Sequence, residues 1–209
     1  MTSAQFITFE GGEGSGKSTQ IRLLADFLRQ RGIGVAMTRE PGGAPGAEEI
    51  RSLLVRGEAS RWDPVSETLL LYAARRNHVL QTIRPALMAG QWVLCDRFND
   101  STLAYQGVGH GLDPAFLDIL FQVSVEDTRP DLTFLLDIDP SIGLNRAERR
   151  GDAENRFESM DLSFHVRLRE GFLSLAAKDQ ERFRVIDATR PVDQVHQDIT
   201  KVLGEAFTL

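Results

Sequence analysis

Short apolar runs alternate along the chain with longer segments in which apolar residues recur every three or four positions. The short runs have the length of buried strands, and the longer segments have the period of helices that pack one face on a sheet. Strands separated by helices are typical of a parallel sheet built from βαβ units, so the pattern predicts an α/β fold. Strands are expected at Gln5–Glu10, Gly34–Thr38, Trp92–Asp96, Leu132–Ile138 and Phe183–Asp187.

The first helix is expected to begin inside a glycine-rich loop and to end near Arg31, where Gly32 stops it. Several later helices have a proline near the first turn, where the N–H that proline lacks is not needed. Residues 149–158 have no apolar period and are interpreted as a mobile connection. The other helices are predicted over Ala47–Arg56, from Asp63-Pro64 to Pro85 or beyond, and over Pro114–Val125, Pro140–Arg150, Ser163–Lys178 and Val192–Phe207.

Composition narrows the class of protein. No linker divides the 209 residues, so one domain over residues 1–209 is expected. The net charge of −6 argues against a broad nucleic-acid or membrane surface, and no apolar run approaches the roughly 20 residues of a membrane span. The N-terminus lacks the pattern of a signal peptide. The one cysteine, Cys95, cannot form an internal disulfide, which indicates a reducing, cytoplasmic setting, and it is expected in the core.

The stretch GGEGSGKST, residues 11–19, lies between the first predicted strand and helix and fits the phosphate-loop pattern G-x-x-x-x-G-K-[ST]. Backbone N–H groups of such a loop converge on phosphate oxygens at a helix N-terminus. Lys17 is expected to reach the β and γ phosphates, and the Ser18 hydroxyl to hold Mg²⁺. The expected ATP-binding residues of the loop are Gly11, Gly12, Glu13, Gly14, Ser15, Gly16, Lys17, Ser18 and Thr19.

A nucleotide site does not name the reaction. The guanine-reading NKxD and the DxxG loop of GTP switches are absent from the sequence, and so is the LSGGQ of transporter-type ATPases. A small chain with a separate acceptor site favours a kinase of a small molecule. A nucleoside kinase with Glu40 or Asp96 as general base, and a regulatory module without turnover, stay open as alternatives.

Four further stretches lie at, or can face, the carboxyl ends of the predicted strands, where open α/β sheets bind ligands. They are TREPGG at 38–43, YAAR at 72–75, DRF at 96–98 and STLAYQG at 101–107. In order and spacing this set, with GGEGSGKST, closely resembles bacterial thymidylate kinase. The resemblance runs nearly end to end, through RPDLTFLLDI and IDATRP.

The resemblance implies transfer of a phosphoryl group from ATP to dTMP with Mg²⁺. It also implies a three-layer fold, with a five-stranded parallel sheet between helices, a flexible lid near residues 146–158, and a homodimer. The chemistry agrees, because a phosphate monoester is already a nucleophile at neutral pH. Catalysis then requires positioning and neutralisation of charge by cations rather than a general base.

Matched residue by residue, the resemblance assigns Arg97 to the acceptor phosphate and Arg75 to the thymine O4 edge. It assigns Gln106 to the base and the Tyr105 ring to the sugar 2′ position. Asp96 either acts on Mg²⁺ through water or caps its strand. Glu40 and Pro41 would shape the floor of the thymine pocket, with Thr102 and Leu71 among the other dTMP-binding residues. Leu71 departs from the family, which has a phenylalanine there to stack on thymine, so the aromatic stacking term of roughly 0.5–1.5 kcal/mol is lost.

The phosphate loop has no arginine between its glycines, and relatives of this kind supply one from the lid. Arg146 and Arg150 are the favoured sources among the arginines of that stretch, which also include Arg149 and Arg156. Arg190 in IDATRP resembles the residue that packs over adenine. None of the four histidines is assigned a role.

Glu13 has two interpretations, because a carboxylate repels phosphate. It is either a solvent-facing loop residue or, as the resemblance implies, the acceptor of a hydrogen bond from the deoxyribose 3′-hydroxyl, directly or through water or metal. In the second interpretation the loop is double-sided, with backbone N–H groups on the donor and Glu13 on the acceptor sugar.

Overall fold

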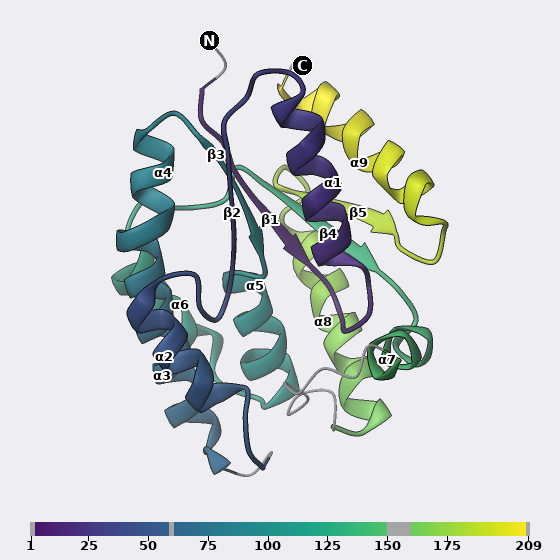
Figure 1. Cartoon of the computed structure of the whole chain (residues 1–209). Coiled ribbons are helices and arrows are strands. Elements are labelled where there is room, and N and C mark those ends of the chain that lie inside the picture. Colours follow the sequence, from purple (N-terminus) through teal and green to yellow (C-terminus); the bar gives the residue numbers. More distant parts are fainter. Residues whose placement is uncertain (1–2, 59–60, 150–159, 208–209) are drawn as a thin grey trace.

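The computed structural model describes residues 3–58, 61–149 and 160–207. In this part of the chain, five parallel strands form one sheet in the order β2-β3-β1-β4-β5, which confirms the predicted α/β fold (Figure 1). The neighbours of β1 are β3 and β4, which follow it much later in the chain, so β1 lies at a topological switch point of the kind that binds ligands. The strands are β1 Phe6–Glu10, β2 Val35–Arg39, β3 Trp92–Asp96, β4 Leu132–Asp137 and β5 Phe183–Asp187.

The helices follow the predicted order, with ends shifted by one or a few residues. The long helix after Asp63 continues through a π-helical segment, as expected from its apolar period. The helical stretch Asn99–Gly109 is absent from the predicted set, because the side chains that it buries are largely polar. The helical elements are α1 Lys17–Arg29, α2 Pro45–Leu54, α3 Pro64–His78, η2 Val79–Ile83, α4 Arg84–Met88, α5 Asn99–Thr102, η3 Leu103–Gly109, α6 Pro114–Val125, α7 Pro140–Glu148, α8 Leu162–Lys178 and α9 Val192–Phe207.

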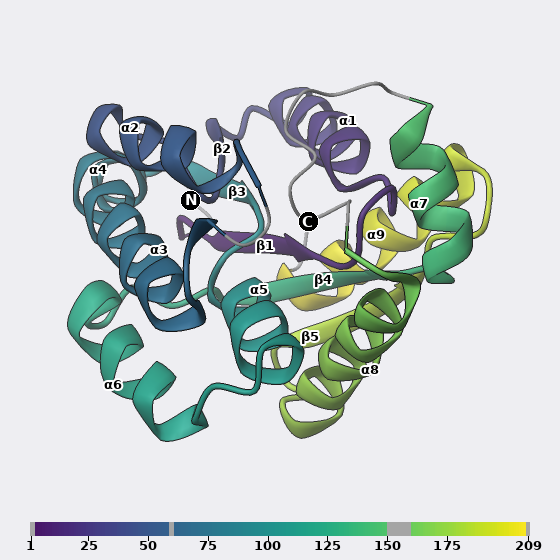
Figure 2. The same cartoon turned by 90° about the horizontal axis from the view of Figure 1, so that it is seen from below.

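Helices cover both faces of the sheet, as the view from below shows (Figure 2). Successive strand residues point to opposite faces, so each strand contributes to two cores. Ile7 and Phe9 pack with α1 and α9, in a cluster that includes the expected inward residues Ile21, Leu24 and Leu28. Phe6 and Cys95 pack on the other face, against α3, η2 and α6. Cys95 is fully buried, as predicted.

Among the described residues, four helices begin after an aspartate whose side chain accepts backbone N–H groups of the first turn. Asp63, Asp113 and Asp139 each precede a proline at the first helical position, and Asp161 caps α8. The carboxylate satisfies N–H groups that have no partner inside the helix, and proline supplies a suitable φ. The sequence therefore specifies these helix starts locally.

The expected lid, residues 146–158, is described only up to residue 149. Helix α7 ends at Glu148 and not at the expected Arg150, which lies outside the described residues together with Arg156. Within the described ranges, no helix has both the length and the apolar character needed to cross a membrane.

Candidate active site at the carboxyl ends of the strands

The phosphate loop joins β1 to α1. Lys17 at the start of α1 is buried, and its Nζ donates to the carbonyl oxygens of Gly11 and Gly12 at 3.1 and 3.0 Å. Burial lowers the pKa of Lys17 to about 8, with a further contribution from Arg97 that nearby carboxylates oppose. Thr19 follows in the first turn of α1. The ammonium group is thus held at the loop by backbone oxygens that a phosphate can replace.

The loop also contacts helix α7 closely. Gly14 has a φ of +66°, and a Cβ built there would clash with the carbonyl oxygen of Gly143. A Cβ at Gly143 would in turn clash with the carbonyl oxygen of Glu13. Two glycines therefore permit the loop and the helix that leads toward residue 149 to touch backbone to backbone.

Ser18 and Asp96 meet at the mouth of the loop. The Ser18 hydroxyl donates to Asp96 Oδ2 at 2.7 Å, which joins the first turn of α1 to the end of β3. A hydroxyl and a carboxylate are the oxygen ligands that Mg²⁺ takes beside substrate phosphates, so this pair fits the ion. The described residues contain no group of three or more His, Cys, Asp or Glu that could hold a metal by itself.

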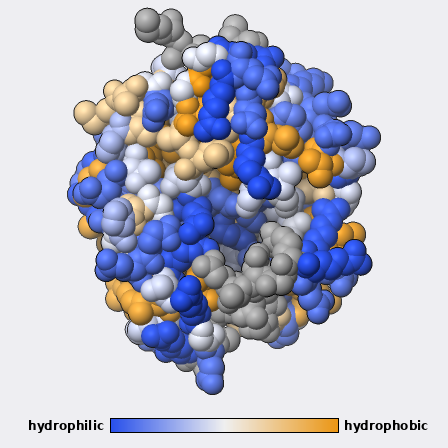
Figure 3. Space-filling model, in the orientation of Figure 1, coloured by the Kyte–Doolittle hydropathy of each residue, from blue (hydrophilic) through white to orange (hydrophobic). Residues whose placement is uncertain are grey.

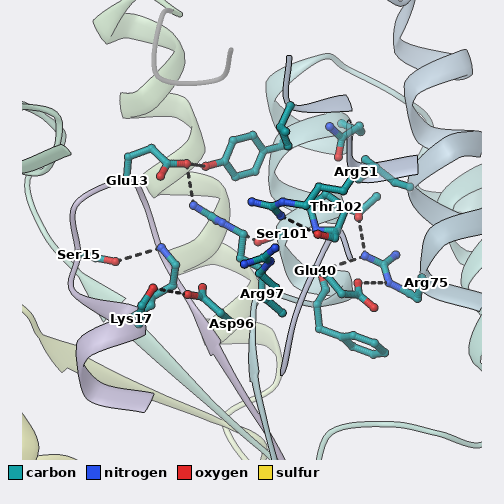
Figure 4. A pocket seen from close by; sticks show the side chains of 18 of the residues that line it. Glu13, Ser15, Lys17, Glu40, Arg51, Arg75, Asp96, Arg97, Ser101 and Thr102 are labelled. Carbon is teal, nitrogen blue, oxygen red and sulfur yellow. Dashed lines mark hydrogen bonds and ion pairs between the residues drawn. The ribbon is translucent and has the colours of Figure 1, made fainter. Parts of the chain in front are cut away.

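Glu13 points from the loop toward Arg97, which follows β3 (Figure 4). Its Oε1 accepts from Arg97 Nη2 at 2.8 Å and from the Tyr105 hydroxyl at 2.9 Å. Burial alone would raise the pKa of Glu13, but the charges of Arg97 and Lys17 and the Tyr105 hydrogen bond outweigh it and lower the pKa to about 2. The carboxylate is therefore ionised at neutral pH, and it is not a solvent-facing loop residue.

Arg97 has a left-handed backbone, with a φ of +67°, which costs a non-glycine residue on the order of 1–3 kcal/mol. Its Nη1 donates to the Gly11 carbonyl oxygen at 3.0 Å and to Ser101 Oγ at 3.1 Å. Burial by itself would lower the pKa of Arg97, but Tyr105 and Glu13 raise it above its usual range. The guanidinium is thus a fixed cation between the loop and α5.

Arg75 is buried on α3, with only 2% of its surface exposed. Its Nε donates to Glu40 Oε2 at 2.7 Å, and its Nη2 donates to Thr102 Oγ1 at 2.9 Å. The other oxygen of Glu40 lies 3.0 Å from His78 Nδ1. Both oxygens of Glu40 therefore have partners already, and the guanidinium is held rigidly.

The remaining acceptor-side residues also line one cavity of about 460 Å³. Figure 3 shows this face of the molecule hollowed near its middle, among mostly hydrophilic residues. Leu71 lines the cavity, whereas the Tyr72 hydroxyl points away and donates to Asn99 Oδ1. Gln106 lines it too, and its Nε2 donates to Glu67 Oε1 at 2.8 Å. The expected residues among the lining are Glu13, Gly14, Ser15, Gly16, Lys17, Ser18, Glu40, Pro41, Leu71, Arg75, Asp96, Arg97, Thr102, Tyr105 and Gln106.

Comparisons with known proteins identify the family. The family model described as thymidylate kinase matches residues 9–199. The chain is 54% identical to thymidylate kinase of Caulobacter vibrioides over 209 residues, 100% of both chains, and 54% identical to that of Magnetococcus marinus over 203 residues, 97% of each. The chain belongs to the thymidylate kinase family.

A solved structure agrees with this assignment. A thymidylate kinase from Ehrlichia chaffeensis matches with a TM-score of 0.80 at 38% identity, covering 96% of this chain and 99% of that chain. The family resemblance stated from the sequence motifs is confirmed, and the protein is an enzyme of the nucleoside monophosphate kinase class.

Two arginines expected on the donor side do not line the cavity described above. Arg146 on α7 is exposed, and its Nη1 donates to the carbonyl oxygen of Ala188 at 3.0 Å. Arg190 is exposed as well and pairs with Asp198 along α9. Both residues lie by the loop after β5, and their expected roles stay predictions.

Sequence reasoning missed several residues that hold the site together. These residues make hydrogen bonds to the side chains or the backbone of residues that line the cavity; they are Glu10, Glu67, His78, Asn99 and Ser101. Glu10 could have been found from the sequence, because it is an acidic residue at the end of the apolar run before the phosphate loop. His78 lies inside a helical pattern, and only the approach of β2 gives it partners.

Proposed function

We propose that this protein transfers the γ-phosphoryl group of ATP to dTMP, giving ADP and dTDP, a step of dTTP biosynthesis. The observation that carries the proposal is the contact between Glu13 of the phosphate loop and Arg97 after β3. It joins a donor-phosphate site to a fixed cation in one cavity. The 54% identity to two thymidylate kinases over nearly the whole chain supports dTMP as the acceptor.

The chain's own residues would act by position and charge. Lys17 would hold the β and γ phosphates together with the backbone N–H groups of residues 11–19. Arg97 would grip the dTMP phosphate, because a guanidinium fits a phosphate dianion with two parallel hydrogen bonds. The acceptor oxygen then needs no base, and the two cations hold the reacting groups in line.

Ser18 and Asp96 would hold Mg²⁺, Ser18 directly and Asp96 through water. Their hydroxyl and carboxylate oxygens are 2.7 Å apart at the mouth of the loop. An ion held there would supply positive charge to offset the charge that develops on the transferring phosphoryl group. We assign Asp96 to the ion rather than to strand capping.

The base and sugar of dTMP would occupy the cavity beyond Arg97. The buried guanidinium of Arg75 is held by Glu40 and Thr102 so that it can meet the thymine O4 edge. Leu71 offers an apolar face in place of an aromatic ring. Gln106, Tyr105 and Pro41 complete the proposed dTMP site.

Glu13 would bind the deoxyribose of dTMP. Arg97 and Tyr105 both donate to its Oε1. We assign Oε2 to the 3′-hydroxyl of the deoxyribose, directly or through water or metal. This extends the double-sided loop expected from the sequence.

An arginine from residues 146–158 would complete charge neutralisation, because the described phosphate loop carries Glu13, Gly14 and Ser15 where some relatives have an arginine. Arg146 and Arg150 are the proposed sources, within a lid of one continuous domain. Arg190 would pack over adenine. Such an arginine is worth about 10³–10⁵ in rate in phosphoryl-transfer enzymes.

We also propose a homodimer in the cytoplasm. Exposed apolar side chains gather on α3, η2 and α6: Leu69, Leu80, Ile119 and Val123. These helices lie side by side, as the contact of Arg76 with the Ser124 carbonyl oxygen indicates. Sedimentation equilibrium tests the dimer, and a monomer at assay concentration would contradict it.

A nucleoside kinase is the first rival, and it needs a base to deprotonate a hydroxyl acceptor. Glu40 is already bonded through both oxygens, to Arg75 and His78. Asp96 accepts from Ser18. These contacts favour the monophosphate as acceptor.

Release of ADP measured in parallel with dTMP, thymidine, UMP and AMP tests the proposal. We expect turnover with dTMP and little with the other three. Activity on thymidine but not on dTMP would overturn it in favour of the nucleoside kinase. Tight ATP binding without turnover on any acceptor would instead favour a regulatory module. Against that rival, Lys17, Arg75 and Arg97 all line one cavity.

A further inference from the structure

Glu10 is the last residue of β1 and directly precedes the phosphate loop. It is fully buried, and both of its carboxylate oxygens accept hydrogen bonds. Oε1 accepts from the backbone N–H of Phe98 at 2.7 Å, and Oε2 accepts from the Ser101 hydroxyl at 2.6 Å. A buried carboxylate is costly unless it is bonded in this way, so its placement beside Arg97 calls for a reason.

The first of these bonds holds the strained backbone at Arg97. The N–H of Arg97 donates to the Phe9 carbonyl oxygen at 2.9 Å, and the next N–H along the chain donates to Glu10. The end of β1 therefore binds the turn on both sides of the left-handed residue. Without that clamp, the turn is free to relax to an ordinary φ and to swing the Arg97 side chain away.

The second bond sets the polarity of Ser101. A hydroxyl has one proton and two lone pairs. Because Ser101 gives its proton to Glu10, its lone pairs face the guanidinium, and Arg97 Nη1 donates to them at 3.1 Å. Glu10 thus reaches Arg97 through both the backbone and a side chain.

We propose that Glu10 is a positioning residue that aims Arg97 at the phosphate of the acceptor nucleotide. It does so by clamping the turn at Phe98 and by orienting the Ser101 hydroxyl. The proposal rests on the role of Arg97 proposed above. Arg97 stays the group that touches the substrate, and Glu10 acts only through it.

We would measure the binding of dTMP and of thymidine by calorimetry at about pH 8. Comparing the two ligands isolates the contribution of the dTMP phosphate to binding affinity. The readout is the ratio of the Kd of thymidine to the Kd of dTMP. We expect Glu10→Gln and Ser101→Ala each to lower this ratio by about tenfold, the loss of one hydrogen bond to a charged group. A merely structural loss would weaken both ligands equally and leave the ratio unchanged.

Asp131→Asn is a matched control. Asp131 Oδ2 accepts the backbone N–H of Phe6 at 2.7 Å, at the opposite end of the same strand. The substitution removes a strand-clamping carboxylate of the same kind, far from Arg97. We expect the Kd ratio to stay within about twofold of wild type.

The Arg97→Lys variant and its combination with Glu10→Gln decide the mechanism. If Glu10 acts through Arg97, the double variant should lower the Kd ratio by much less than the product of the two single effects. Suppose that Arg97→Lys lowers the Kd ratio. The positioning role of Glu10 is then overturned if the effects of Glu10→Gln and Arg97→Lys are additive. It is also overturned if both Glu10→Gln and Ser101→Ala leave the ratio unchanged. An unchanged ratio in Arg97→Lys would instead remove the proposed role of Arg97, and this inference with it. If Glu10→Gln failed to fold by circular dichroism, Ser101→Ala would carry the test.

Discussion

Glu13 and Arg97 form an ion pair across 84 positions of sequence, with Oε1 and Nη2 2.8 Å apart. The Glu13 carboxylate would repel a phosphate, but here it binds the Arg97 guanidinium on the acceptor side of the site. The side chains are only 18% and 16% exposed, so water screens the pair weakly. The ion pair therefore links the phosphate loop to the acceptor side of the site.

Glu13→Ala is expected to damage the use of dTMP far more than that of ATP. The change leaves Arg97 and the Tyr105 hydroxyl without their shared partner. We expect kcat/KM for dTMP to fall on the order of a hundredfold, since truncating one member of a buried pair costs several kcal/mol. Steady-state kinetics with each substrate varied checks this, with Glu13→Gln as the isosteric comparison. Equal losses for both substrates would return Glu13 to a structural role.

Leu71→Phe is expected to keep or lower the KM for dTMP. Leu71 lines the cavity, and a ring there adds an aromatic term of about 0.5–1.5 kcal/mol against thymine, or up to about tenfold in affinity. Leu53→Phe on α2 makes the same chemical change at an exposed position outside the cavity and should leave KM unaltered. A large rise in KM for Leu71→Phe would show that thymine binds elsewhere.

Replacing Arg146 and Arg150 with alanine, one at a time, tests the lid. At least one variant should lose more than about tenfold in kcat, because a transition-state arginine is worth about 10³–10⁵. Arg184→Ala is the control: like Arg146, Arg184 donates to a backbone carbonyl oxygen, but on β5. Losses below tenfold in both lid variants would reject the proposal.

Gly143→Ala is expected to impair ATP use. The new Cβ would collide with the Glu13 carbonyl oxygen and push α7 from the phosphate loop. A displacement of about 1 Å can cost on the order of a hundredfold in rate, so kcat/KM for ATP should fall by at least tenfold. Gly204→Ala on α9 is the control, because a Cβ there meets nothing within 4 Å. It should leave activity intact and stabilise the protein by about 0.5–1 kcal/mol in urea unfolding. Normal activity in Gly143→Ala would show that the contact is dispensable.

Stability should depend on pH through Glu10. Burial, helped by Asp100, raises its pKa from about 4.5 to about 7 against the opposing effects of Ser101 and Arg97. The folded state therefore holds the proton more tightly, so the stability that Glu10 contributes is complete below about pH 4.5 and is lost as pH rises through 7. The charged or titratable groups that also act with Glu10 are Lys17, Arg75, Cys95 and Tyr105.

Urea unfolding of wild type and Glu10→Gln between about pH 5 and 8 measures this effect. Glutamine cannot titrate, so the free energy of unfolding of wild type minus that of the variant should fall with rising pH. A difference that stays constant across this range would show that the carboxylate is already ionised at pH 5.

Local pattern predicted the central strands well, because β1, β3 and β4 are buried on both faces and read as continuous apolar runs. Trp92–Asp96 and Phe183–Asp187 have the expected ends, and the other three strands differ by a residue or so. The helical stretch Asn99–Gly109 escaped prediction for the opposite reason. It buries Asp100 and Gln106, whose partners Arg182 and Glu67 come from distant elements.

The sequence by itself determined the phosphate loop, the order of the strands and helices along the chain, and the family. These depend on neighbouring residues: a glycine-rich turn before a helix, a proline after a capping aspartate, and an apolar period. Only the tertiary structure decided which charges meet. Glu10 finds Phe98 at a separation of 88 residues, and Glu40 finds His78 at 38. A buried charge must be paired wherever the fold places it, and no local pattern carries that information.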